Sequence, residues 1–117
     1  NREMEQVIAA ILEKSSTPPI IILQGDHGPG DHYNTLKLDK GCLWERYSIL
    51  NAYYFPNKDY AALYPEITPV NSFRVILNAY FGADLDLLED RNYYAAWFAP
   101  YQFVDVTNEI NNSCSTP

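Results

Sequence analysis

Apolar residues recur at helical spacing near the start of the chain, at positions 4, 7, 8, 11 and 12, with polar residues between them. This period predicts an amphipathic helix. Pro18 and Pro19 end it, because proline cannot continue a helix. The apolar run at 20–23 then predicts a buried, parallel strand. Helix, short loop and strand in this order are typical of half a βαβ crossover, whose first strand we expect to lie outside this chain.

The middle of the chain carries one further strand pattern and one further helix pattern. Residues 28–41 are polar and contain glycine, so they predict a loop. Residues 48–55 predict a second strand, and 60–65 are compatible with a single helical turn. Thr68 and Pro69 are typical of a helix start, and Gly82 is typical of a helix end. Between them, apolar residues at 70, 73, 76, 77 and 80 predict the buried stripe of this helix.

After Gly82 the pattern becomes irregular. Residues 93–98 are aromatic without a clear period, and 103–107 predict a short final strand. We therefore expect an α/β fold over residues 1–107, with flanking helices, short strands and an irregular, aromatic-rich C-terminal segment. Residues 108–117 are polar and predict a flexible tail.

Composition narrows the class of protein. The 117 residues are 47% hydrophobic, which is enough for one domain with a real core. A net charge of −7 argues against nucleic acid as a partner. No apolar run is long enough to span a bilayer, and the polar start is unlike a signal peptide. Because the chain does not begin with Met, we expect a segment of a longer polypeptide, although a processed terminus would look the same.

Two cysteines, Cys42 and Cys114, are too few for a disulfide framework and lack metal-site spacing. We interpret them as two ordinary thiols, and the alternative of a disulfide between them stays open.

The strongest chemical signal lies at the carboxyl end of the first predicted strand, where Asp26 and His27 are adjacent. Open α/β sheets place their ligands at such strand ends. Gly25 and Gly28 allow the turn that would let both side chains reach one cation. Carboxylate and imidazole ligands suit a divalent ion such as Zn²⁺, Mn²⁺, Mg²⁺ or Ca²⁺. The alternative is a turn-forming aspartate beside a surface histidine.

Two further pairs carry weaker signals. Asp31 and His32 repeat the Asp-His pair, but their spacing matches no metal motif, and we interpret them as loop residues. Arg46, after Glu45, could bind a sulfate or phosphate oxygen of a substrate, although such pairs are more often solvated surface charge. The sequence contains no nucleophile elbow and no phosphate-binding Gly-Lys-Ser/Thr loop.

These residues resemble the C-terminal part of the sulfatase branch of the alkaline phosphatase superfamily, within its bacterial membrane-associated, sulfatase-like group. Residues 20–28 look like its strand and Asp-His-Gly signature. Residues 45–56 look like the Arg-led strand that ends in Pro, and residues 67–82 look like the helix that closes on Gly. Residues 87–94 resemble the tail of this group. The resemblance covers most of residues 4–107.

The resemblance implies a metal-dependent hydrolase or transferase acting on sulfate or phosphate esters, with an alkaline-phosphatase-like sheet. Asp26 and His27 would contribute to the metal site, and Gly28 would allow the tight turn. The nucleophile and the other metal ligands would lie upstream in the same polypeptide, so this chain would be inactive alone. The downstream His-Gly ligand of two-zinc members has no counterpart here. Relatives with this tail imply a membrane-anchored parent with an extracytoplasmic catalytic domain.

A second hypothesis is a free-standing binding or assembly module. Its partner surface would be formed by the aromatic residues at 53–55 and 93–101. Under the first hypothesis the strand at 20–23 would have an open edge, so we expect the segment to self-associate.

Overall fold

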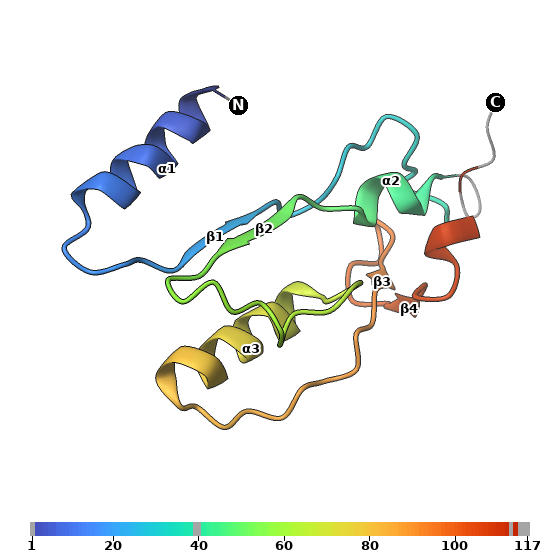
Figure 1. The fold of residues 1–117 in the computed structure, drawn as a ribbon. Helices are drawn as coiled ribbons and strands as arrows, with labels where there is room; N and C mark the ends of the chain where they lie inside the picture. The colour runs from blue at the N-terminus through green and yellow to red at the C-terminus, as the bar shows by residue number, and fades with distance from the viewer. Residues whose placement is uncertain (1, 39–40, 113, 115–117) are drawn as a thin grey trace.

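The fold is mixed, with helices and small antiparallel sheets (Figure 1). A computed structural model describes residues 2–38, 41–112 and 114. Two two-stranded sheets form within these residues, β1–β2 and β3–β4. None of the described helices has both the length and the apolar character that crossing a bilayer requires. The elements are α1 (Arg2–Lys14), β1 (Ile21–Gln24), α2 (Leu43–Tyr47), β2 (Asn51–Tyr54), α3 (Pro69–Phe81), β3 (Tyr93–Tyr94), β4 (Val104–Asp105) and the 3₁₀ turn η2 (Ile110–Asn112).

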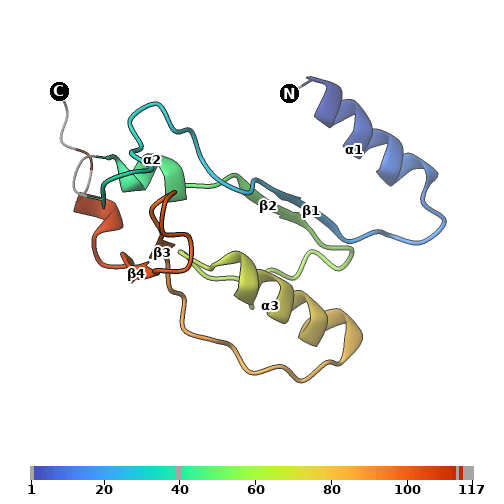
Figure 2. The same ribbon diagram turned by 180° about the vertical axis from the view of Figure 1, so that it is seen from behind.

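The predicted first helix is confirmed as α1. It ends where expected, and both the backbone N–H and the hydroxyl of Ser15 donate to the Ile11 carbonyl. However, α1 has no buried residue, and its apolar stripe, including Val7 at 53% exposed, faces outward. Figures 1 and 2 both show α1 standing apart from the other elements.

The strand predicted at 20–23 forms one residue later, as β1, and its partner within the chain is β2. The two strands are antiparallel, with Ile22 opposite Tyr53 and Leu23 opposite Ala52. We predicted a parallel strand, but β1 pairs with β2 in the antiparallel direction. All four residues of β1 are half-buried rather than buried. Each strand of a two-stranded sheet has one edge without a partner strand, so part of it stays accessible, which explains the difference.

The predicted helix at Thr68 forms as α3, but its buried face differs from the predicted one. Thr68 is the N-cap, although its side chain makes no capping hydrogen bond, and Gly82 closes the helix with φ of 61°. The buried residues are Asn71, Ser72, Val75 and Ile76. Of the predicted stripe, Val70, Phe73 and Leu77 are exposed. Ile76 of the predicted stripe is buried and Tyr80 is half-buried, so the prediction holds in part. It fails elsewhere because the polar side chains of Asn71 and Ser72 occupy half of the buried face.

The segment after the second strand forms turns rather than a helix. The N–H of Leu63 donates to the Tyr60 carbonyl at 3.0 Å, but no helical run follows within residues 60–65. Residues 83–92 are also irregular, as predicted, and run back along α3 (Figure 1).

Buried side chains pack at two places besides the buried face of α3. Phe55, 2% exposed, contacts the rings of Tyr60 and Tyr80 at centroid distances of 5.2 and 5.3 Å. A second group at the C-terminal end contains Leu43, Tyr94 and Val106. Phe55 therefore belongs to the interior, whereas Tyr53 and Tyr54 are half-buried, so the predicted partner surface at 53–55 does not include Phe55.

The C-terminal end is attached to α2 by packing and by a covalent bond. Cys42 and Cys114 form a disulfide with a Cα–Cα distance of 4.6 Å, so the interpretation as free thiols was wrong. The turn η2 lies beside α2 (Figure 1). A flexible tail was predicted at 108–117. This range contains the turn η2 and the disulfide-bonded Cys114. Residues 113 and 115–117 lie outside the described residues.

Candidate functional site

Asp26 and His27 lie in a bend directly after β1, at the end of the strand, as the sequence predicted. Their side chains approach each other, with Asp26 Oδ2 3.5 Å from His27 Nε2. The Asp26 side chain is 89% exposed and that of His27 is 46% exposed. The two potential ligand atoms therefore face solvent together and can reach one ion.

The short helix α2 brings Arg46 to the same place. Arg46 Nη1 lies 2.5 Å from His27 Nδ1, and its guanidinium carbon lies 5.5 Å from the centre of the Tyr33 ring. Cys42 is the N-cap of α2, and its Sγ accepts from the Glu45 N–H at 3.4 Å. The sequence pattern did not predict α2, because five residues are too few to show a helical period.

Gly28 allows α2 to come this close. Its N–H donates to the Arg46 carbonyl at 2.8 Å, and a Cβ at this position would overlap the Glu45 carbonyl oxygen. Neither Gly28 nor Gly25 has a positive φ; among the described glycines that conformation occurs at Gly82. The two glycines were predicted for turn freedom, but Gly28 is needed for a close backbone approach instead.

The side chains of Asp26, His27 and Arg46 line an open groove of about 910 Å³. Its walls also carry aromatic rings, carboxylates and amides from α2, β2, the turns before α3 and the C-terminal segment. Arg46 is the one Lys or Arg residue in this lining among the described residues. Residues that line the groove beside Asp26, His27 and Arg46 include Tyr33, Trp44, Tyr53, Tyr64, Asp90 and Thr107.

Asp31 and His32 are not in this groove lining. The His32 N–H donates to Glu45 Oε2 at 2.9 Å, and its Nδ1 lies 3.5 Å from the same oxygen. This pairing agrees with their interpretation as loop residues. Glu45, predicted as surface charge, thus holds the loop that contains His32.

Asp90 forms a polar connection on another wall, which the sequence analysis missed. Its carboxylate accepts from the Tyr64 hydroxyl at 2.6 Å and from the Thr68 N–H at 2.7 Å, at the start of α3. Desolvation alone would raise the pKa of Asp90, but hydrogen bonds from Tyr64, Thr68 and Asn71 outweigh it and lower that pKa. Asp90 therefore holds the N-cap residue of α3 through its backbone N–H, and its negative charge lies at the favourable end of the helix dipole.

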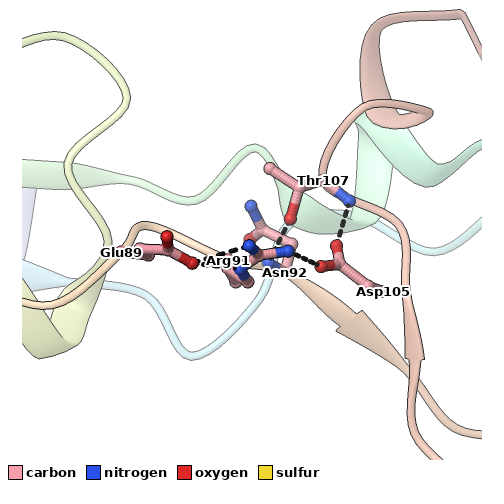
Figure 3. Close-up of polar contacts among 5 residues, drawn as sticks. All are labelled: Glu89, Arg91, Asn92, Asp105 and Thr107. Atoms are coloured by element: carbon pink, nitrogen blue, oxygen red, sulfur yellow. Dashed lines mark hydrogen bonds and ion pairs between the residues drawn. The ribbon is translucent and has the colours of Figure 1, made fainter.

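Next to Asp90, Arg91 bridges two carboxylates (Figure 3). It lies 2.6 Å from Glu89 and 2.5 Å from Asp105, and these contacts raise the pKa of Arg91. Thr107 completes the group, since its N–H donates to Asp105 and its hydroxyl accepts from the Asn92 N–H at 2.8 Å. These contacts lower the pKa of Asp105 to about 2. The group fixes the groove wall that contains Asn92 and Thr107.

The donor set at the predicted metal site is incomplete within the part of the chain that the structure describes. Across the described residues, no group of three or more His, Cys, Asp and Glu side chains could hold a metal ion. The pair of Asp26 and His27 nevertheless has a suitable spacing. Two ligand atoms about 2.0–2.1 Å from a tetrahedral ion lie roughly 3.3–3.4 Å apart, close to the 3.5 Å between these two.

Comparison of the chain with protein-family models, with curated proteins and with solved structures gives no match. The resemblance to sulfatase-like proteins therefore stays a prediction that rests on the residues quoted for it.

Proposed function

We propose that this chain is the C-terminal part of a metal-dependent hydrolase or transferase that acts on sulfate or phosphate esters. The observation that supports it is the position of Asp26 and His27. Both follow a strand end, and their ligand atoms lie 3.5 Å apart beside a groove. Two protein ligands cannot complete a coordination shell, so the remaining ligands and the nucleophile would come from the upstream part of the same polypeptide.

The ligand spacing also bears on the identity of the cation. Ca²⁺ with ligands at 2.3–2.6 Å places neighbouring oxygens roughly 3.3–3.7 Å apart. An octahedral Mg²⁺ site requires a shorter separation, roughly 2.8–3.0 Å. The 3.5 Å between Asp26 Oδ2 and His27 Nε2 excludes an ideal Mg²⁺ site. Zn²⁺ fits better than Ca²⁺, because Zn²⁺ takes both carboxylate and imidazole ligands and Ca²⁺ prefers oxygen.

Within the proposed reaction, Asp26 and His27 hold the cation and Arg46 holds an oxygen of the ester anion. The cation, when bound, would neutralise charge on the transferring sulfuryl or phosphoryl group. Arg46 is suited to its role because a guanidinium can bind two oxygens of such a group at once.

The larger fold follows from the same proposal. Within the described residues β1 pairs with β2, and we propose that its other edge joins the central sheet of an alkaline-phosphatase-like domain. The disulfide between Cys42 and Cys114 supports an extracytoplasmic setting for the catalytic domain, because disulfides persist in oxidising compartments. A membrane anchor would lie elsewhere in the polypeptide.

Cation binding tests the proposal. Zn²⁺, Ca²⁺ and Mn²⁺ would be titrated into the protein by calorimetry. Asp26→Asn and His27→Gln should each weaken binding at least tenfold, because each removes one of two ligands. Asp31→Asn and His32→Gln are matched controls from the neighbouring loop and should leave affinity unchanged. Equal cation affinities for all four variants would contradict the proposal.

A second function is favoured by the exposed aromatic residues of the C-terminal loop. Trp97, Phe98 and Tyr101 are 81%, 73% and 89% exposed. Between Arg91 and Asp105 the sequence has no charged residue. Such a surface is typical of a contact site, so the alternative is a non-catalytic assembly module.

Light scattering, which measures self-association, separates the two proposed functions. Self-association through the β1 edge should survive Trp97→Ser and Phe98→Ser, whereas association through the aromatic loop should be lost. A protein that stays monomeric at high concentration would argue against both contacts.

A further inference from the structure

The ring nitrogen Nδ1 of His27 has two polar neighbours of opposite kind. The Gly28 carbonyl oxygen lies 2.8 Å away, and Arg46 Nη1 lies 2.5 Å away. A carbonyl can only accept a hydrogen bond, and a guanidinium can only donate one. Nδ1 carries either a proton or a lone pair, so it can satisfy one of these neighbours at a time.

In the first arrangement, Nδ1 is unprotonated and accepts from Arg46. The imidazole proton is then on Nε2, the atom that lies 3.5 Å from Asp26 Oδ2. A protonated Nε2 has no lone pair available, so His27 cannot bind a cation through this atom.

In the second arrangement, Nδ1 carries the proton and donates to the Gly28 carbonyl. The Nε2 lone pair is then free beside the Asp26 carboxylate. This is the usual form of a metal-binding histidine, whose other nitrogen donates to a backbone carbonyl. Arg46 loses its acceptor on the ring in this arrangement and keeps only a longer hydrogen bond to the Gly28 carbonyl, at 3.4 Å.

We propose that Arg46 and the cation compete for the two states of His27, so that cation binding releases the Arg46 guanidinium to bind a sulfate or phosphate anion. The inference rests on the proposed function and adds an order of binding to it. One proton moves from Nε2 to Nδ1 through exchange with water, and the ring stays neutral. The cation site and the anion site are thereby coupled through one imidazole.

The released guanidinium stays at the groove. The backbone of Arg46 is held by the hydrogen bond from Gly28, at 2.8 Å, and its side chain lies over the Tyr33 ring. It is the one Lys or Arg side chain in the groove lining within the described residues. An anion that enters this groove would therefore meet Arg46 as its positively charged partner.

The test uses nitrogen-15 NMR of the two imidazoles, with His32 as an internal control. Without added metal, His27 should carry its proton on Nε2, and added Zn²⁺ should move it to Nδ1. Arg46→Met keeps the side-chain length but removes the donor. It should strengthen Zn²⁺ binding roughly three- to tenfold, because a competing hydrogen bond is lost. Arg74→Met, on α3, is the matched control and should change neither property.

Anion binding gives the second measurement. Inorganic sulfate should bind at least tenfold more tightly to the Zn²⁺-loaded protein than to the metal-free protein, and Arg46→Met should abolish the difference. Weaker Zn²⁺ binding by Arg46→Met, or sulfate binding that is independent of Zn²⁺, overturns the inference while the metal site stands. Zn²⁺ binding that does not depend on Asp26 and His27 overturns both proposals.

Discussion

The side-chain amide of Asn71 pairs with both backbone polar groups of Leu88. Its Oδ1 accepts from the Leu88 N–H at 2.9 Å, and its Nδ2 donates to the Leu88 carbonyl at 2.7 Å. Asn78 makes the same pair with Leu85, at 2.7 and 2.8 Å. Seven residues separate the two asparagines, so both lie on one face of α3. The helix therefore holds the irregular segment 83–92 through side-chain amides instead of through a sheet.

Asn71→Ala should destabilise the protein by about 2–3 kcal/mol, because Asn71 is fully buried and its loss leaves the Leu88 groups without their partner. Asn78→Ala should cost about 1 kcal/mol, since this residue is only half-buried and water can replace it. Urea unfolding of both variants measures the difference. Equal losses would show that burial does not set the cost of breaking this contact.

Gly28→Ala should be far more damaging than Gly25→Ala. A Cβ at Gly28 would overlap backbone oxygens of Glu45 and Ser48, which cannot move without shifting α2. We expect a loss of about 1–3 kcal/mol, the usual cost of overpacking. At Gly25 the nearest atom to an added Cβ is 3.5 Å away, so that variant is the control. Thermal unfolding compares them, and similar midpoints would contradict the close approach of α2.

Breaking the disulfide should lower stability by about 4 kcal/mol, because it closes a long loop of sequence separation 72. Cys42→Ser with Cys114→Ser tests this and keeps an oxygen at the N-cap of α2. Cys42→Ala with Cys114→Ser also removes the cap and should lose about 1 kcal/mol more. Denaturant unfolding with and without reductant measures both effects. Wild-type protein that is insensitive to reductant would contradict the prediction.

Acid should destabilise the fold through Asp105. Hydrogen bonds from Thr107 and Arg91 hold the pKa of Asp105 at about 2, below its ordinary value of 3.8. The carboxylate therefore stabilises the folded state above about pH 4, and this contribution is lost as the pH falls toward 2.

Asp105→Asn should flatten the fall in stability over this pH range, as measured by unfolding at several pH values. Part of the fall should remain, because the pKa of Asp90 is also lowered. Asp31→Asn, in an exposed loop, controls for the loss of one negative charge. An unchanged pH profile for Asp105→Asn would show that another carboxylate dominates acid unfolding.

Local signals in the sequence predicted α1 and α3 with their ends, and predicted β1 to within one residue. Pro19, Thr68 and Gly82 act on their own neighbours, so their effect can be read without knowing the fold. The same holds for Asp26 and His27, which follow a strand end in the sequence and in the structure.

Contacts between distant residues could not be predicted in this way. The sequence does not show that Arg46 meets His27, that Cys42 bonds to Cys114, or that polar residues fill the buried face of α3. Each depends on how loops bring separated segments together, and hydrophobic period carries no information about that. The sequence alone determined where α1, β1, β2 and α3 form and where the Asp-His pair lies, because these follow from neighbouring residues. Only the tertiary structure decided which side chains surround that pair, because packing selects them.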